Sequence, residues 1–352
     1  MPPVWNKKVL TVLMQWEYCD PKRGEGGEKA AFFETISGLA AKTEGFWYDE
    51  YISDLPLLRA KLIEAAEKFQ PDLIFFNPYT NQLDPETLAK LKARWPTCAW
   101  FGDDTWRFER FSSKLAPHFT HVLTTDHFSI GKYRKLGVEP ILTQWAARPY
   151  GESSTPLKAG EKYRFEVSFL GAYTQVRGWF IKMLAAQGIK VDCFGPGWPN
   201  GKVTFREMEA VFRDSRINLN LSNSVSRDLR FVFGSPMNFA RYLHSPKTGE
   251  QIKARNFEIP LAGGFQLTNY VAGLERYLKI GEEVAVYSSP EECAGQIRYF
   301  LENEQERRAV MTAGCLRAAA EHTYSHRFHK IFSAIWPQGG MVWDSKVMAQ
   351  RE

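Results

Sequence analysis

The densest group of residues that could do chemistry lies between positions 250 and 264. It contains two carboxylates that bracket two cations, followed by a pair of glycines: Glu250, Lys253, Arg255, Glu258, Gly263 and Gly264. A carboxylate that opens a helix can accept hydrogen bonds from both hydroxyls of a ribose, and nearby cations and helix-start amides can hold a diphosphate. The pattern favours a sugar nucleotide, although glutamate pairs also occur in ordinary charged helices.

Two more segments of the second half offer contacts of the same kind. Gly171-Ala-Tyr-Thr-Gln-Val-Arg177 follows a predicted strand and precedes a predicted helix. Its free amides, the hydroxyl of Tyr173 and the Arg177 guanidinium suit a diphosphate, whereas the alternative is a plain surface arginine. Phe194-Gly-Pro-Gly-Trp198 ends another predicted strand. Here Gly195 allows a turn and Trp198 offers a flat ring for a base, and an ordinary turn is equally compatible.

The first half carries polar residues directly after its predicted strands, where ligands gather in open parallel sheets. Asp103 and Asp104 follow an apolar strand and suit a carboxylate that binds hydroxyls or acts as a general base; the alternative is a helix cap. A glycine loop with Gly26, Gly27 and Glu28, and Asp126 further on, complete the acceptor-side candidates. The loop lacks the glycine spacing of dinucleotide sites and P-loops, so it is no nucleotide cradle by motif.

Composition limits the classes of protein that need to be considered. The chain has 352 residues, 44% of them hydrophobic and 24% charged, with a net charge of +5 that is not gathered in tracts. These values predict two packed domains and argue against disorder and against a dedicated nucleic-acid binder. Five widely spaced cysteines predict a reduced, cytoplasmic protein without a disulfide framework. No apolar run is long enough to span a bilayer, so any membrane contact should be peripheral.

Short apolar runs alternate with amphipathic stretches, as parallel sheets covered by helices require. In the first half, strands are predicted at 9–16, 73–77, 97–101, 121–125 and 142–145, and helices at 28–41 and 57–69, with a further helix opening at Asp84. In the second half, strands are predicted at 165–170, 190–194, 217–221 and 284–287, and helices at 179–187, 205–213, 291–302 and 305–322. We therefore expect an α/β fold with domains at 1–150 and 160–330, a linker at 149–162, and a tail, 331–352, that packs on the first domain.

Taken together, these segments resemble the CgeB-like, spore-maturation-type glycosyltransferases, which are related to glycosyltransferase families 1 and 4. The similarity extends over most of the chain. In the first half it rests on Pro71–Phe75, Trp100–Phe108 and Tyr133–Gly137. In the second half it rests on Val167–Gly171, Ile217–Ser222, Lys253–Gly264, Gly281–Val284 and His322–Arg327.

The resemblance implies a GT-B fold, in which two Rossmann-like, doubly wound domains face each other across a cleft. The second domain would hold a nucleoside-diphosphate sugar and the first an acceptor: a glycan, a lipid-linked group, a protein or a modified nucleic acid. Glu258 matches the ribose-binding position, Glu250 the first glutamate of the pair in retaining enzymes, and Arg177 lies near a phosphate-binding residue. Glu250 departs from the family in its His-Ser-Pro-Lys-Thr-Gly setting.

The implied reaction needs no metal and no cofactor besides the donor, in agreement with the absence of an Asp-x-Asp motif. Cations can stabilise the departing diphosphate. The glutamate spacing favours retention, whereas an inverting reaction would use Asp103 or Asp104 as base. Two alternatives stay open: a sugar-nucleotide epimerase of the same fold, and a silent module that binds a nucleotide sugar. The sequence does not determine the donor, the acceptor or the oligomeric state.

Overall fold

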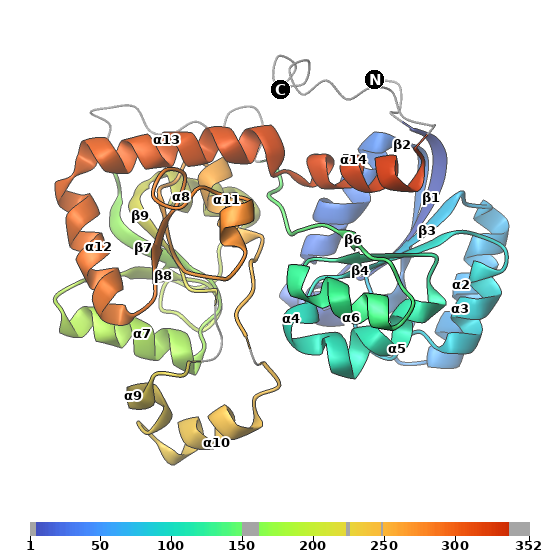
Figure 1. Cartoon of the computed structure of the whole chain (residues 1–352), viewed down its shortest axis with the longest axis horizontal. Coiled ribbons are helices and arrows are strands. Elements are labelled where there is room, and N and C mark those ends of the chain that lie inside the picture. The colour runs from blue at the N-terminus through green and yellow to red at the C-terminus, as the bar shows by residue number, and fades with distance from the viewer. Residues whose placement is uncertain (1–4, 150–161, 223–225, 248, 338–352) are drawn as a thin grey trace. The chain divides into compact units, whose positions relative to one another are not determined.

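The computed structural model describes residues 5–149, 162–222, 226–247 and 249–337 (Figure 1). Contacts divide the described residues into two compact units, one formed by 5–144 with 324–337 and the other by 145–323. Most of the predicted linker, residues 150–161, and the end of the predicted tail, residues 338–352, lie outside the described residues. No described helix is both long enough and apolar enough to cross a bilayer.

The described part of the first unit contains a six-stranded parallel sheet in the order β2-β1-β3-β4-β5-β6. The strands are β1 (Trp5–Leu13), β2 (Ala40–Trp47), β3 (Leu73–Phe76), β4 (Thr97–Phe101), β5 (His121–Thr124) and β6 (Ile141–Leu142). Every residue of β3 and β4 is buried, as expected for central parallel strands that are covered on both faces. The buried, apolar runs of these strands are the feature by which the sequence could reveal them.

The helices of the first unit follow its strands. They are the π-helical segment η3 (Lys29–Phe33), α1 (Glu34–Leu39), α2 (Leu55–Phe69), α3 (Pro85–Lys92), α4 (Asp104–Arg107), α5 (Ser113–Leu115), α6 (Ile130–Lys135) and α14 (Tyr324–Ile335). Local capping sets where the long ones begin: Asp54 accepts a hydrogen bond from Leu57 N at 3.0 Å and Asp84 from Thr87 N at 2.8 Å, each with a proline in the first turn. In Figure 1, α2 and α3 lie side by side on one flank of this sheet.

The first unit differs from the sequence prediction at β2. The helix predicted to reach Ala41 ends at Leu39, and β2 follows it directly and pairs in parallel with β1 at the edge of the sheet. Only Ala40 and Phe46 of this strand are buried. An edge strand with so few buried side chains has no apolar run, so no local pattern indicated it.

The C-terminal helix α14 belongs to the first unit. Its Phe332 ring lies 5.5 Å from the Trp5 ring of β1, and Phe328 lies 5.8 Å from Phe32 of η3. Trp5, Phe328 and Phe332 are all fully buried. Helix α14 therefore closes part of this core with residues from the opposite end of the described chain.

The described part of the second unit contains a five-stranded parallel sheet in the order β11-β10-β9-β7-β8. Its strands are β7 (Phe165–Leu170), β8 (Asp192–Phe194), β9 (Ser215–Asn220), β10 (Gln266–Asn269) and β11 (Ala285–Tyr287). Its helices are α7 (Gln175–Ala186), α8 (Phe205–Arg213), α9 (Leu229–Val232), α10 (Pro236–His244), α11 (Arg255–Leu261), α12 (Pro290–Glu302) and α13 (Glu304–Glu321). The predicted strands and helices of this half occur close to the predicted places.

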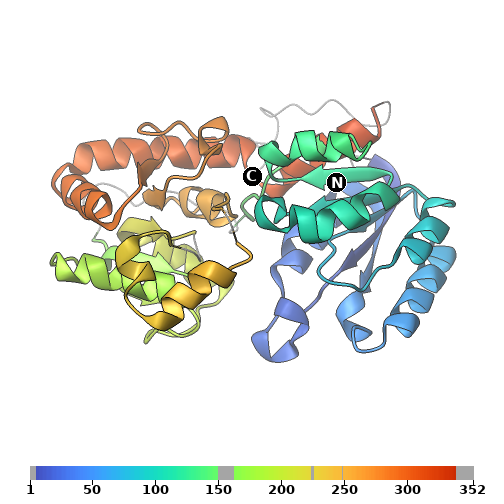
Figure 2. The same cartoon turned by 60° about the horizontal axis from the view of Figure 1, so that its bottom comes forward.

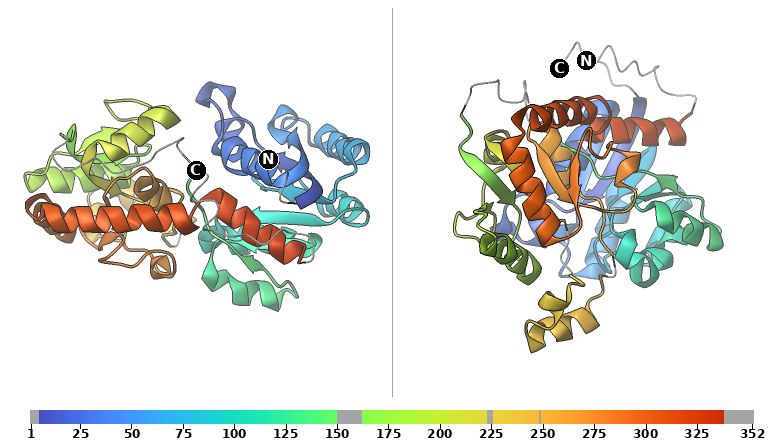
Figure 3. Two further views of the ribbon diagram at one scale, coloured as in Figure 1. Left: turned by 90° about the horizontal axis from the view of Figure 1, so that it is seen from above. Right: turned by 60° about the vertical axis from the view of Figure 1, so that its left-hand side comes forward.

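Helices α9 and α10, which were not predicted from the sequence, form a projection from the second unit. Figure 1 and the right-hand view of Figure 3 both show them beyond the body of that unit, and in Figure 2 they come forward in front of α7. Helix α10 has no buried residue, and Phe233, Met237 and Leu243 are 69%, 61% and 61% exposed. The start of α10 nevertheless carries a local helix signal, because the Ser235 side chain accepts a hydrogen bond from Asn238 N at 3.1 Å and a proline stands in the first turn.

Candidate ligand sites at the sheet edges

Each sheet has one point at which the chain changes direction across it. The connection from β1 leads to β2 on one side, and β3 then returns to the other side of β1; in the second sheet, β8 and β9 flank β7 in the same way. Ligands of open α/β sheets bind outside the carboxyl ends of the strands at such a switch point. The β1/β3 and β7/β9 positions are therefore the places at which the predicted residues should be sought.

In the second unit, Arg177 spans the β7/β9 switch point. Its Nη1 donates to the carbonyl of Ala172 after β7 at 2.8 Å, and its Nε donates to the carbonyl of Leu221 after β9 at 3.0 Å. Thr174 caps α7 by accepting from Arg177 N at 3.2 Å. Arg177 thus lies where the sequence placed a diphosphate contact, and the same side chain also joins the ends of the two strands.

The loops after β7 and β8 pack tightly against each other and bring Gly171, Tyr173, Gly195 and Trp198 together. Trp198 Nε1 donates to the Gly171 carbonyl at 2.9 Å, and the Tyr173 and Trp198 rings meet edge to face at 5.0 Å. Gly195 has φ +123°, and a Cβ at this position would overlap the Gly171 carbonyl oxygen. Only glycine fits there, because both the backbone conformation and the close approach exclude a side chain.

Glu250 is tied to the carboxyl ends of β9 and β10. The Asn269 amide donates to Glu250 Oε2, and Asn269 Oδ1 accepts from the backbone N and the hydroxyl of Ser222 at 3.0 and 2.8 Å. Burial is the main cause that raises the pKa of Tyr287. The negative charge of Glu250 also raises this pKa, and the positive charge of Arg177 lowers it. Glu250 and Arg177 therefore lie on the same edge of the sheet, around the buried Tyr287.

Three further polar residues at this edge were not predicted as site residues: Ser222, Asn269 and Tyr287. Each stands at or directly after the end of a strand, since Tyr287 ends β11, Asn269 ends β10 and Ser222 follows β9 closely. The rule that found Arg177 and Asp103, which searches the residues that follow strands, would have found these three as well.

Glu258 lies in α11 and is 8% exposed. Its Oε2 accepts from Arg255 Nη1 at 2.9 Å, and the Arg255 guanidinium lies 5.2 Å from the Phe212 ring. The Lys253 backbone N donates to Asn256 Oδ1 at 3.0 Å. Arg255 therefore neutralises Glu258 and can serve a diphosphate only by sharing its donors.

Gly263 and Gly264 follow α11 and shape its packing. Gly263 has φ +77°, which favours glycine. A Cβ at Gly264 would come within 2.7 Å of both the Asn218 amide nitrogen and the Phe212 carbonyl oxygen. These two glycines therefore let α11 approach β9 and α8 closely, whether or not they also contact a ligand.

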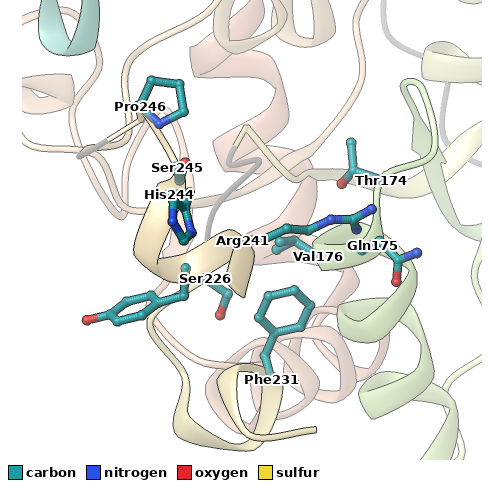
Figure 4. A pocket seen from close by; sticks show the side chains of 10 residues that line it. Thr174, Gln175, Val176, Ser226, Phe231, Arg241, His244, Ser245 and Pro246 are labelled. Carbon is teal, nitrogen blue, oxygen red and sulfur yellow. The ribbon is translucent and has the colours of Figure 1, made fainter. Parts of the chain in front are cut away.

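A pocket of about 360 Å³ lies between the start of α7 and α10 (Figure 4). Thr174, Gln175 and Val176 line one side of it, and Arg241 and His244 line the other. In Figure 4 the Arg241 side chain points toward the start of α7. The unpredicted helix α10 therefore places a further cation near the start of α7, which carries Arg177.

In the first unit, Asp104 is buried and makes structural contacts. It is 1% exposed and accepts hydrogen bonds from the hydroxyls of Thr124 at 2.6 Å and Tyr133 at 2.7 Å. Asp126 caps a turn by accepting from Phe128 N at 3.2 Å and from the Ser129 hydroxyl at 2.6 Å. Asp103 is only partly buried, so it is the member of the Asp103-Asp104 pair that lies nearer to solvent.

Asp104→Asn is expected to flatten the dependence of stability on pH between about 4 and 6. Burial raises the pKa of Asp104 from 3.8 to about 6, so the folded state keeps this proton where the unfolded chain has lost it. Stability is therefore lost as pH rises through this window, by about 3 kcal/mol. Urea unfolding at pH 4.5 and 7 measures the difference; equal pH dependence in variant and wild type would contradict the assignment.

Glu28 spans the β1/β3 switch point of the first sheet. Its Oε2 accepts from the backbone N of Met14, after β1, at 2.9 Å, and its Oε1 accepts from the Asn77 amide, after β3, at 2.7 Å. The glycine loop before it is held to the end of β1, since Gly26 N donates to the Gln15 carbonyl at 2.7 Å. A Cβ added at Gly27 would have no atom within 4 Å. Among the described residues no three His, Cys, Asp or Glu side chains group as metal ligands.

Comparison with known proteins identifies the fold, because the matching structures cover both units of the chain. Residues 177–333 match the family model described as glycosyl transferase-like. HepE from Anabaena, solved with UDP and glucose, superposes with a TM-score of 0.63 at 12% identity, with 94% of this chain and 100% of HepE covered. Sucrose-phosphate synthase from Thermosynechococcus elongatus gives 0.64 at 9% identity, with 94% and 100% covered. The fold is GT-B.

A third solved structure agrees. A glycosyltransferase from Rickettsia africae has a TM-score of 0.62 at 10% identity, with 95% of this chain and 100% of that protein covered. A search of curated proteins finds no match. The match to the family model begins at Arg177 and includes Glu250 and Glu258, so it contains most of the polar residues at the edge of the second sheet.

Proposed function

We propose that this chain is a CgeB-like glycosyltransferase that moves a sugar from a nucleoside diphosphate to an acceptor. The observation that carries the proposal is the gathering of Arg177 and Glu250 at the carboxyl ends of β7, β9 and β10, in a segment that matches a glycosyl transferase-like family. HepE, which has the same fold, was solved in complex with UDP and glucose. A donor bound by this edge of the second unit accounts for the charges found there.

In this proposal the second unit holds the donor and stabilises its leaving group. Glu258 accepts the ribose hydroxyls, and Arg177 and Lys253 face the diphosphate, whose negative charge grows as the bond to the sugar breaks. These cations supply the stabilisation without a metal. Glu250, fixed by Asn269, stands beside the sugar. The transfer proceeds with retention, for which the protein needs no general base.

An inverting reaction would replace this scheme, and it would use Asp103 as its general base. Asp104 is engaged with the hydroxyls of Thr124 and Tyr133, which removes it from that role. Product stereochemistry, read by proton NMR of the anomeric position, separates the two schemes. A product of inverted configuration would contradict retention and make Asp103 the base to test.

The test of the function is a calorimetric screen with nucleoside diphosphates, followed by incubation with the sugar nucleotides of the base that binds. We expect one base to bind and its sugar nucleotide to be hydrolysed slowly without an acceptor. NMR of the donor alone identifies an epimerase, because the sugar would change while the bond to phosphate stays intact. Tight binding without any turnover would indicate a module that binds a nucleotide sugar but does not catalyse a reaction. A chain that binds no nucleotide would refute the proposal.

A further inference from the structure

The α9–α10 projection, residues 226–247, gathers exposed apolar side chains. Six of the sixteen large hydrophobic residues that are exposed in the described part of the chain lie there, and their exposed fractions range from 41% to 69%: Leu229, Phe233, Met237, Phe239, Tyr242 and Leu243. Apolar residues that are exposed singly are ordinary, whereas a group of them on one short segment marks an interaction surface.

Helix α10 turns its polar side toward the body of the second unit. Asn238 Nδ2 donates to the carbonyl of Phe231 at 3.0 Å, and Phe231 is buried in a cluster with Val176 of α7. Arg241 and Tyr242 line the pocket beside the start of α7, and Figure 4 shows Arg241 pointing toward that start. Because residues three and four positions apart share one face of a helix, Asn238, Arg241 and Tyr242 form a single stripe.

The opposite stripe of α10 is apolar and exposed. Its members have the spacing of one side of a helix: Pro236, Phe239, Ala240 and Leu243. The Phe233 ring at the end of α9 stacks on the Phe239 ring at 5.8 Å, so the exposed apolar surface continues from one helix to the other. A helix of a globular protein normally buries such a stripe against its own core. The outward orientation of this stripe therefore indicates an apolar partner outside the unit.

The projection is also basic. It contains three arginines and one lysine but a single acidic residue, Asp228. Asp228 and Glu291 of α12 both pair with Arg230, so this acidic charge is already engaged where α9 is held to the unit. Arg227 and Arg241 are exposed and add positive charge beside the apolar stripe. Exposed apolar side chains next to cations are typical of helices that lie in the interface of an anionic bilayer.

The size and charge of the projection argue against a second copy of the chain as its partner. Helix α9 has four residues and α10 has nine, whereas a stable protein–protein interface takes about 20–30 residues from each side. A second copy would also bring the same excess of positive charge to the contact. A lipid surface has no fixed shape to match, and its anionic headgroups compensate the positive charge.

We propose that the α9–α10 projection docks the chain on a bilayer that contains anionic lipids. Phe233, Met237 and Leu243 enter the boundary between headgroups and acyl chains, and Arg227 and Arg241 stay at the level of the headgroup phosphates. This contact is peripheral. It goes beyond the proposed transfer of a sugar and does not depend on it, because none of these side chains belongs to the donor site.

Co-sedimentation of the full chain with lipid vesicles tests the proposal. We expect the chain to bind vesicles of equal parts phosphatidylglycerol and phosphatidylcholine, and to bind phosphatidylcholine alone much more weakly. Raising sodium chloride from about 0.05 M to about 0.5 M should weaken the binding, because salt screens the attraction between arginines and headgroups. If the chain did not sediment with the anionic vesicles, or sedimented equally with both kinds, the proposal would be wrong.

Leu243→Glu places a negative charge in the apolar stripe and should lower the affinity for anionic vesicles at least about 10-fold. The matched control is Leu316→Glu, which changes a 67% exposed leucine in α13 of the same unit and should bind as Leu316 wild type does. Both leucines are exposed, so both variants should keep the wild-type thermal midpoint in circular dichroism. If Leu243→Glu bound vesicles as tightly as the control, the lipid contact would not lie on α10 and the proposal would fail.

The charge contribution is measured with Arg227→Gln/Arg241→Gln, which should bind anionic vesicles several-fold more weakly than wild type. Arg164→Gln/Lys190→Gln removes the same amount of charge from exposed positions just before β7 and β8, at the amino edge of the sheet. The projection instead follows the carboxyl end of β9. Equal losses of affinity in the two double variants would show that only the total charge matters, which contradicts a contact through the projection.

Light scattering of the chain without vesicles tests the other occupant of this surface. We expect the same mass for wild type and Leu243→Glu. A wild-type dimer that Leu243→Glu converts to a monomer would show that a second copy covers α10, and it would overturn the proposed lipid contact.

Discussion

Glu258→Ala is expected to weaken nucleoside diphosphate binding by at least about 100-fold in isothermal titration calorimetry. The carboxylate is 8% exposed and already paired with Arg255, so it is fixed in place before a ribose arrives. Each hydrogen bond to a charged group contributes about 1.5–3 kcal/mol, and two ribose hydroxyls bind here in the proposed arrangement. Every 1.4 kcal/mol corresponds to about a factor of ten in affinity, so even the lower figure for two bonds gives about 100-fold.

Two further variants serve as controls for this substitution. Glu302→Ala removes an exposed carboxylate from α12 of the same unit and should leave the affinity unchanged. Glu258→Gln keeps the shape of the side chain while removing its charge, and it should bind more weakly than wild type but better than Glu258→Ala. If Glu258→Ala bound the nucleotide as tightly as wild type, Glu258 would not be a ribose ligand.

Gly195→Ala is expected to lower the thermal midpoint of the chain by about 8 °C. The added Cβ would overlap the Gly171 carbonyl oxygen, and the backbone has φ +123°, which L-residues rarely adopt. Strain of this kind together with the overlap costs about 3 kcal/mol, and a unit of this size shifts by about 2–4 °C per kcal/mol. The loops that carry Tyr173 and Trp198 should separate, and nucleotide affinity should fall with them.

The matched control for this substitution is Gly295→Ala in α12. Nothing lies within 4 Å of a Cβ at that position, and alanine favours a helix over glycine by about 1 kcal/mol. Gly295→Ala should therefore melt at the wild-type temperature or slightly above it. Calorimetric scans of wild type, Gly195→Ala and Gly295→Ala measure the effect. If Gly195→Ala melted at the same temperature as Gly295→Ala, the two loops would accommodate the added Cβ without strain.

Much of the fold follows from local sequence signals. The buried apolar runs of β3, β4 and β7 identified central strands, because a strand covered on both faces is largely apolar along its length. Asp54 and Asp84 marked helix starts, since a capping side chain bonds to amides only a few residues away. Strand β2 carried no such signal, because few of its residues are buried. Helix α10 was missed although Ser235 caps it and a proline stands in its first turn.

The candidate donor site was predictable in part. Arg177 could be identified as a candidate because it follows a recognisable strand closely, and Glu250 and Glu258 because they lie in a charged cluster. Their partners could not be assigned: Arg177 donates to Leu221, 44 residues away, and Asn269 donates to Glu250 from the end of a different strand. These pairings depend on which strands are neighbours in the sheet, and strand order is not encoded in any local pattern.

The carboxyl edge of the first sheet shows the same division. The sequence alone determined that a glycine loop with Glu28 follows the first strand. Only the tertiary structure decided that Asp49, whose Oδ2 accepts from Gln15 N at 2.8 Å, stands at the end of β1, because that contact requires β2 to pair with β1. Residues within a few positions of each other are related by the geometry of one helix or strand, whereas residues on separate strands meet only when burial of the whole sheet surface fixes their order.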